Sequence, residues 1–249
     1  KALVEDPNQV GYYSAAVKLA EAPRLVLLAF SFALLPSLSG AIADQNLDQI
    51  RHYLQQTVRL LALVLLPILA LVSVTSEALV TITFSAAYRP AAPILSVLIF
   101  TYAIYTVYIT LVTTLLAENR PGRALAIPLA LLPLALGAIW LGVTRLGTMG
   151  AAFASLLTVT VAATVVIVYV YRRFRPPVGV RSLARIALAS VVVGAAAYLW
   201  SPSGLVLIVA YGLLGGLYLA LLLVLGEIRI RDLAMVAEWL PLPRRNKGA

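Results

Sequence analysis

Three charged residues stand close together at the start of the first long apolar segment. Lys18, Glu21 and Arg24 recur every three residues within "VKLAEAPRLVLLAF", positions 17–30. At about 100° per residue they share one face of a helix, and Glu21 can pair with either cation. The chemistry that this triad offers is electrostatic. A charge fully exposed to lipid costs about 2.5–3.5 kcal/mol or more, so we expect this face to meet a cavity, a partner helix or water.

Two interpretations of the triad remain open. Residues 25–42 form about 27 Å of helix, which is nearly enough to span a bilayer and would leave the triad in a solvated turn at the outer surface. Residues 11–22 are otherwise mostly apolar, however, and a helix that begins at Gly11 would overshoot the bilayer. That second observation favours a charged cavity mouth.

Aromatic and small residues supply the other candidate sites. Tyr102, Tyr105 and Tyr108 recur on one helical face, which can line a cavity and stack on a sugar, or else pack as ordinary core or as an aromatic belt. Gly212 and Gly216 form a small-xxx-small pair, which is typical of close helix packing.

Other chemistry has little support in the sequence. Glu77 could gate or relay protons, but its place near the end of an apolar segment favours the interface. There is no cysteine, no phosphate-binding Gly-rich loop and no cluster of metal-ligand spacing. We therefore expect a protein that is not an enzyme and that needs no metal and no cofactor.

The elements that must position these residues are membrane helices. The chain has 249 residues, 62% hydrophobic and 12% charged, with a mean hydropathy of +0.97. Seven continuous apolar segments predict an all-α polytopic bundle: 20–42, 60–83, 92–117, 124–143, 149–171, 183–200 and 204–225. Prolines 36, 67, 93, 128 and 133 lie in or near them and are expected to kink helices. Residues 227–249 are expected to form a separate amphipathic, basic tail after a lobe at 1–226.

The basic residues predict the orientation. With the C-terminus taken as inside, fourteen of the 19 lysines and arginines fall in the inner segments and three in the outer ones. This asymmetry predicts a cytoplasmic C-terminus and accounts for the net charge of +9 without nucleic acid. An odd number of spans and a first residue that is not Met lead us to expect a longer protein, although a seven-span receptor-like protein is the rival interpretation.

Four stretches, in order, resemble one family. They are "VGYYSAAVKLAEAP" with "LLPSLS", "FSAAYRPAAPILSVL" (84–98), "LAENRPGRAL" (116–125) and "RLGTMGAAFAS" (145–155). The chain looks like helices eight to fourteen of the polysaccharide and lipid-linked oligosaccharide flippases of the MATE-like (multidrug/oligosaccharidyl-lipid/polysaccharide) superfamily. Each motif alone is weak, and the first lobe of the family's two is absent from this sequence.

The resemblance implies a function for the intact two-lobed protein. It would translocate an undecaprenyl-diphosphate-linked oligosaccharide across the bacterial or archaeal cytoplasmic membrane by alternating access. Lys18, Glu21, Arg24, Tyr102 and Tyr105 would then line the cavity, and the last two helices, with Gly212 and Gly216, could border a groove for the lipid tail. Expected partners are the glycan lipid, the bilayer, the other lobe, and a polysaccharide polymerase or glycosyltransferases.

Three alternatives stay open: a MATE-type ion-coupled exporter of organic cations, a peptidoglycan-precursor flippase, and a membrane subunit of a glycan-assembling enzyme. A cation exporter should present acids in its cavity, whereas the mid-helix charges here are basic or paired. An enzyme subunit should carry a long outer loop with acids, and the outer loops near 84–91, 144–148 and 201–203 are short.

Overall fold

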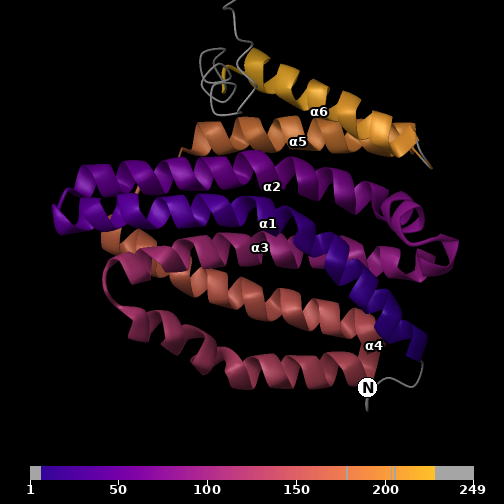
Figure 1. Cartoon of the computed structure of the whole chain (residues 1–249), viewed down its shortest axis with the longest axis horizontal. Helices are drawn as coiled ribbons and strands as arrows, with labels where there is room; N and C mark the ends of the chain where they lie inside the picture. The colour runs from indigo at the N-terminus through magenta and orange to yellow at the C-terminus, as the bar shows by residue number, and fades with distance from the viewer. Residues whose placement is uncertain (1–6, 178, 203, 205, 228–249) are drawn as a thin grey trace, which may run out of the picture.

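The computed structural model describes residues 7–177, 179–202, 204 and 206–227, and for residues 7, 25–35 and 37 it describes the backbone alone. Over this part the chain is helical: α1 (Pro7–Ala43), α2 (Leu47–Thr83), the short 3₁₀ helix η1 (Ala86–Ala91), α3 (Ala92–Ala117), α4 (Pro121–Phe174), α5 (Val180–Trp200) and α6 (Val206–Val224). The helices run side by side along the long axis of the molecule (Figure 1). The predicted all-α bundle is confirmed.

Helix α4 is two antiparallel helices joined at a glycine. Its 54 residues would be about 80 Å long if straight, far more than a bilayer core. At Gly147 the backbone has φ 60° and ψ −140°, which favours glycine, and the chain turns back on itself (Figure 1). The two halves touch at Gly142 and Gly150, where a Cβ added to Gly142 would lie 2.5 Å from the Gly150 carbonyl oxygen. The predicted segments 124–143 and 149–171 therefore both lie in α4.

The expected count of seven separate spans is not matched. Five described helices are long and apolar enough to cross a membrane: α2, η1 with α3, α4, α5 and α6. One reason is that α4 contains two predicted segments. The other is that the segment 20–42 lies within α1, where the side chains of 25–35 are outside the described part. The chain is a multi-pass membrane protein.

The polar stretch 44–59, expected as a break between spans, is mostly helix. Helix α2 begins at Leu47, and the Asn46 side chain caps it by accepting a hydrogen bond from the Gln49 backbone N–H at 3.1 Å. Ile50 and Leu54 are buried four residues apart while their neighbours face outward. The amphipathic periodicity of this stretch therefore decided that it is helical, although most of its residues are polar. The break between the two helices is only the turn at residues 44–46.

Helix α6 compensates for two irregularities in α2. Pro67 has no N–H, so the Leu63 carbonyl loses its helical partner, and the Tyr218 hydroxyl donates to that carbonyl instead, at 2.9 Å. Thr75 has non-helical angles, and its hydroxyl lies 2.7 Å from the Tyr211 hydroxyl. Tyrosines of α6 therefore meet α2 at both irregular positions.

The buried core of the described residues has three larger parts and a small fourth part around Leu61, Leu65 and Ala103. One lies near the ends of α2, α3 and α4 and includes Leu54, Leu115 and Phe174. A second joins α1, α2 and α3 around Ala16, Ala20, Val80 and Leu95, whose alanines let the helices approach closely. The third lies between α2, α5 and α6 and includes Ile186, Val193, Leu214 and Leu222.

Ion pairs and hydrogen bonds connect the predicted inner segments at one end of the bundle. Arg51 Nε donates to the Phe174 carbonyl at 2.9 Å, and Arg173 Nε contacts Glu118 at 3.0 Å. Arg59 contacts Glu227 at 2.7 Å. We call this end the basic end.

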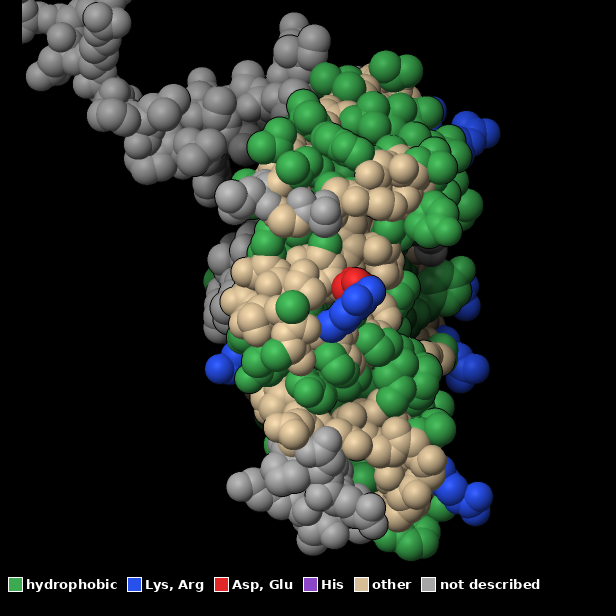
Figure 2. All heavy atoms as spheres, turned by 90° about the vertical axis from the view of Figure 1, so that its right-hand side faces the viewer, with side chains coloured by type: hydrophobic (Ala, Val, Ile, Leu, Met, Phe, Trp, Pro, Cys, Tyr) green, Lys and Arg blue, Asp and Glu red, His purple; other side chains and the backbone are tan. Residues whose placement is uncertain are grey.

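The opposite end holds the turn at Gly147 and the α2–α3 and α5–α6 connections, and it is seen face-on in Figure 2. Hydrophobic and uncharged side chains predominate in that view. Glu77 pairs there with Arg89 at 2.8 Å.

Candidate functional site

A polar cavity of about 350 Å³ lies between α1, α3 and α4. Each helix contributes to it at helical spacing, because residues three or four apart share a face. Its lining residues are Tyr13, Glu21, Arg24, Leu98, Thr101, Tyr102, Tyr105, Ser155 and Val159. Four of the five residues predicted for the substrate site are in this set, and we call it the central cavity.

Arg24 is the most constrained charge in the central cavity. Its guanidinium forms an ion pair with Glu21 on the preceding turn and lies 5.6 Å from the centre of the Tyr105 ring, within the range of a cation–π contact. The side chain is only 22% exposed, and its Nε is buried without a hydrogen-bond partner. One N–H of Arg24 is therefore available for an acceptor.

The central cavity lies at mid-depth. Tyr102 and Tyr105 are near the middle of the 26-residue helix α3, so Tyr105 is about 20 Å from the α3 start along the axis. Since Arg24 lies over the Tyr105 ring, the Glu21–Arg24 pair shares that depth. This placement favours the cavity interpretation of the triad over the interfacial turn.

The three tyrosines divide between the two roles considered for them. Tyr102 and Tyr105 line the central cavity. Tyr108 is buried in the core and packs on Tyr105, with ring centroids 6.1 Å apart. The cavity-lining interpretation fits the first two and the packing interpretation fits the third.

The remaining candidate residues lie elsewhere. Lys18 is exposed and is not among the lining residues, although it is on the helix that carries Glu21 and Arg24. An added Cβ at Gly212 or Gly216 would meet no atom within 4 Å, so these glycines make no close helix contact in the described part. Gly194 does, because a Cβ there would lie 3.1 Å from the Ala70 side chain.

Two cavity residues and one packing residue were not singled out from the sequence. Tyr13 and Ser155 line the central cavity, and both stand inside quoted motifs, at the fourth position of "VGYYSAAVKLAEAP" and at the end of "RLGTMGAAFAS". Gly194 follows Ser190 at small-xxx-small spacing, the signal that was assigned to Gly212 and Gly216. Among the described residues no group of acids or histidines is arranged to hold a metal ion.

The fold and the cavity define a class: a polytopic helical membrane protein whose charged cavity lies at mid-depth. Residues 2–93 match the model of a family described as "Polysaccharide biosynthesis protein". No curated protein matches the chain.

Among solved structures, the chain is similar to the lipid II flippase MurJ in an inward closed conformation. The TM-score is 0.75 at 14% sequence identity, over 92% of this chain and 49% of MurJ. The chain thus spans about half the length of MurJ and has the fold of that half. The two comparisons confirm the resemblance to the MATE-like flippases that the motifs predicted.

Proposed function

We propose that this chain is one lobe of a flippase that moves an undecaprenyl-diphosphate-linked oligosaccharide across the cytoplasmic membrane. The observation that carries the proposal is the Glu21–Arg24 pair in a polar cavity at mid-depth, on a fold similar to half of MurJ. A second lobe would face this one across the full transport pathway. Alternating access would then expose the cavity to each side in turn.

The residues of the central cavity suit a diphosphate. An arginine forms charge-assisted, bidentate hydrogen bonds with phosphate oxygens, and Arg24 retains a buried N–H without a partner. Diphosphate would replace Glu21 as the acceptor, so that the guanidinium stays paired in both states. Lys18 would add a second cation from the exposed side of the same helix. Tyr102 and Tyr105 offer hydroxyl groups and ring faces to the sugar.

The alternative of a cation exporter is less well supported by the site. Glu21 is the acid among the lining residues, and Arg24 already neutralises it. Lipid II is a second possible cargo of the same chemical class, because MurJ is a lipid II flippase. With either cargo, we expect a polysaccharide polymerase or glycosyltransferases as partners.

The test replaces the cations in the intact protein and measures glycan export in a flippase-deficient strain. A hydrogen bond to a charged group contributes about 1.5–3 kcal/mol, so we expect Arg24→Gln to lower export by roughly tenfold or more. Lys18→Gln should lower it less, because that side chain is exposed. Arg89→Gln is the matched control, since it removes an arginine from an exposed ion pair outside the cavity.

Full export by the Lys18→Gln/Arg24→Gln double variant, at normal membrane abundance, would refute the proposal. A cation exporter predicts a different pattern: Glu21→Gln would abolish transport of an organic cation, while Arg24→Gln would be tolerated. Measuring membrane abundance of every variant separates loss of transport from loss of the folded protein.

A further inference from the structure

A second, larger cavity lies at the basic end of the bundle. It has a volume of about 470 Å³ and is formed by α2, by Pro176, Pro177 and Gly179 before α5, by the start of α5 and by the residues that follow α6. Its polar residues include Arg59, Ser182 and Glu227, and its apolar wall includes Leu54, Val58 and Leu183. We call it the end cavity. It is distinct from the central cavity, with which it shares no lining residue.

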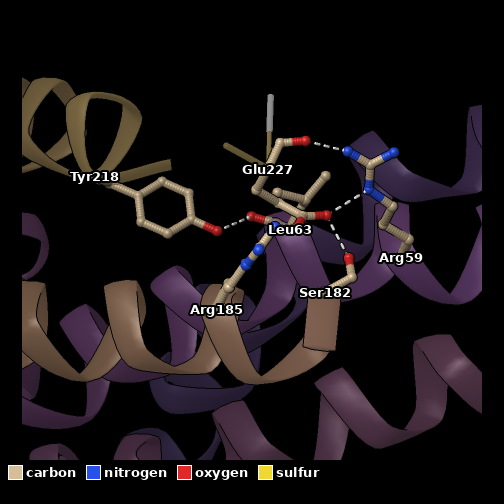
Figure 3. Close-up of polar contacts among 6 residues, drawn as sticks. All are labelled: Arg59, Leu63, Ser182, Arg185, Tyr218 and Glu227. Atoms are coloured by element: carbon tan, nitrogen blue, oxygen red, sulfur yellow. Dashed lines mark hydrogen bonds and ion pairs between the residues drawn. The ribbon is translucent and has the colours of Figure 1, made fainter. Parts of the chain in front are cut away.

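A carboxylate occupies the polar side of the end cavity (Figure 3). The Glu227 side chain is only 5% exposed and accepts hydrogen bonds from Arg59 Nε, at 2.7 Å, and from the Ser182 hydroxyl. Arg59 also donates to the Glu227 backbone carbonyl. These donors, which come from α2 and α5, converge on one anionic group and so form an anion site.

The site carries more positive than negative charge. Arg185 of α5 lies 3.9 Å from Glu227 Oε2, which is beyond hydrogen-bonding distance, and it makes no closer polar contact within the described part of the chain. The side chains of Arg59 and Arg185 are 40% and 46% exposed. One carboxylate therefore faces two guanidinium groups that are both reachable from outside.

We propose that the end cavity binds the phosphate of an anionic membrane phospholipid. The excess positive charge attracts an anion, and basic groups at a membrane surface contribute about 1 kcal/mol each toward anionic lipids. The apolar wall would hold the first part of an acyl chain, which a soluble phosphate lacks. Because the Glu227 carboxylate pairs with the same arginines, the lipid phosphate competes with that carboxylate for them.

The experiment measures lipid retention by the purified chain. The 249-residue protein in uncharged detergent is titrated with phosphatidylglycerol or with phosphatidylcholine of the same acyl chains, and bound lipid is counted by native mass spectrometry. We expect a preference for phosphatidylglycerol that Arg185→Gln weakens by roughly fivefold. Glu227→Gln should strengthen it, because the competing carboxylate is lost.

Two further variants keep the test decisive. Arg59→Gln leaves Glu227 buried with a weaker partner and can unfold the protein, so Arg59→Gln/Glu227→Gln removes both charges together and should lose the preference. Arg51→Gln is the control, because it removes a cation from the same end that pairs with Asp48 and the Phe174 carbonyl instead of with Glu227. The proposal is overturned by an unchanged preference in Arg185→Gln and the double variant, or by an equal loss in Arg51→Gln. It is also overturned by weaker binding in Glu227→Gln, or by inorganic phosphate displacing the lipid at equal concentration, which would indicate a soluble-phosphate site.

Discussion

The turn within α4 gives the sharpest test of the fold, because two glycines touch there. An added Cβ at Gly142 would lie 2.5 Å from the carbonyl oxygen of Gly150, and one at Gly150 would lie even closer to the carbonyl oxygen of Gly142. Real Cβ atoms essentially never approach another heavy atom within 3.0 Å. The obstructing atoms belong to the backbone, so no side-chain rotation can relieve the clash. The two halves of α4 would have to move apart.

The expected magnitude has two opposing contributions. An alanine in a helix is favoured over glycine by about 0.8–1.0 kcal/mol. Overpacking typically costs about 1–3 kcal/mol and occasionally more, and a clash with backbone belongs at the upper limit. We therefore expect Gly150→Ala to lower the free energy of unfolding by about 1–2 kcal/mol. Gly137→Ala lies on the same helix with no atom within 4 Å of the new Cβ, so it should raise that free energy by up to about 1 kcal/mol.

The assay is reversible unfolding of the purified chain in mixed micelles, followed by circular dichroism, with the wild type and both variants measured side by side. The opposite signs of the two changes are the signature of the antiparallel turn. If Gly150→Ala proves as stable as Gly137→Ala, the halves of α4 do not touch at this position. The reversal at Gly147 would then need a different geometry.

Three other predictions follow from the described contacts. Tyr218→Phe removes the donor to the Leu63 carbonyl and should destabilise the protein by about 0.6–1.7 kcal/mol in the same unfolding assay, whereas Tyr198→Phe, at a side chain 70% exposed, should change little. Because the chain has no cysteine, an introduced Cys at position 145 should react with an impermeant thiol reagent in intact cells, and one at 175 should not. Labelling at 175 would overturn the predicted orientation. Residues 1–249 alone should insert in a membrane but not restore glycan export to a flippase-deficient strain, because they cover about half of a MurJ-like protein.

Apolar run length predicted most of the helices well. The segment 92–117 coincides with α3, and 183–200 and 204–225 differ from α5 and α6 by three residues or fewer at each end. Hydropathy reports burial in lipid and is insensitive to where a helix continues through a polar stretch. For that reason it missed the first three turns of α2, where only Ile50 and Leu54 among mostly polar neighbours show the buried face.

The candidate site was predictable in part for a related reason. The spacing of Glu21, Arg24, Tyr102 and Tyr105 placed them on helix faces, and the structure brings those two faces together. Spacing on one helix could not indicate which neighbour each face meets. Gly212 and Gly216 share their spacing with Ser190 and Gly194, yet of these three glycines only Gly194 is in close contact with another helix, at Ala70. The end cavity could not be predicted either, because Arg59 is more than a hundred positions from Ser182 and Glu227, which are themselves 45 positions apart, and the three meet only in the fold.

The ion pairs of the described residues differ in what they hold together. Arg59–Glu227, Arg173–Glu118 and Arg89–Glu77 each join two different elements. The free energy spent on burying or ordering those charges is therefore offset in part because each pair holds two elements of the bundle together.

Two pairs lie within a single helix. Asp48–Arg51 is at the basic end, and its carboxylate is in solvent. An exposed pair of this kind changes the stability of the protein little. Glu21–Arg24 is at mid-depth, partly buried, and bonds one turn of α1 to the next, so it joins no elements. Placing charges at that depth costs several kcal/mol, and an apolar pair would pack the same turn without that cost. This cost favours the proposal that the pair serves a ligand that needs a cation halfway across the membrane.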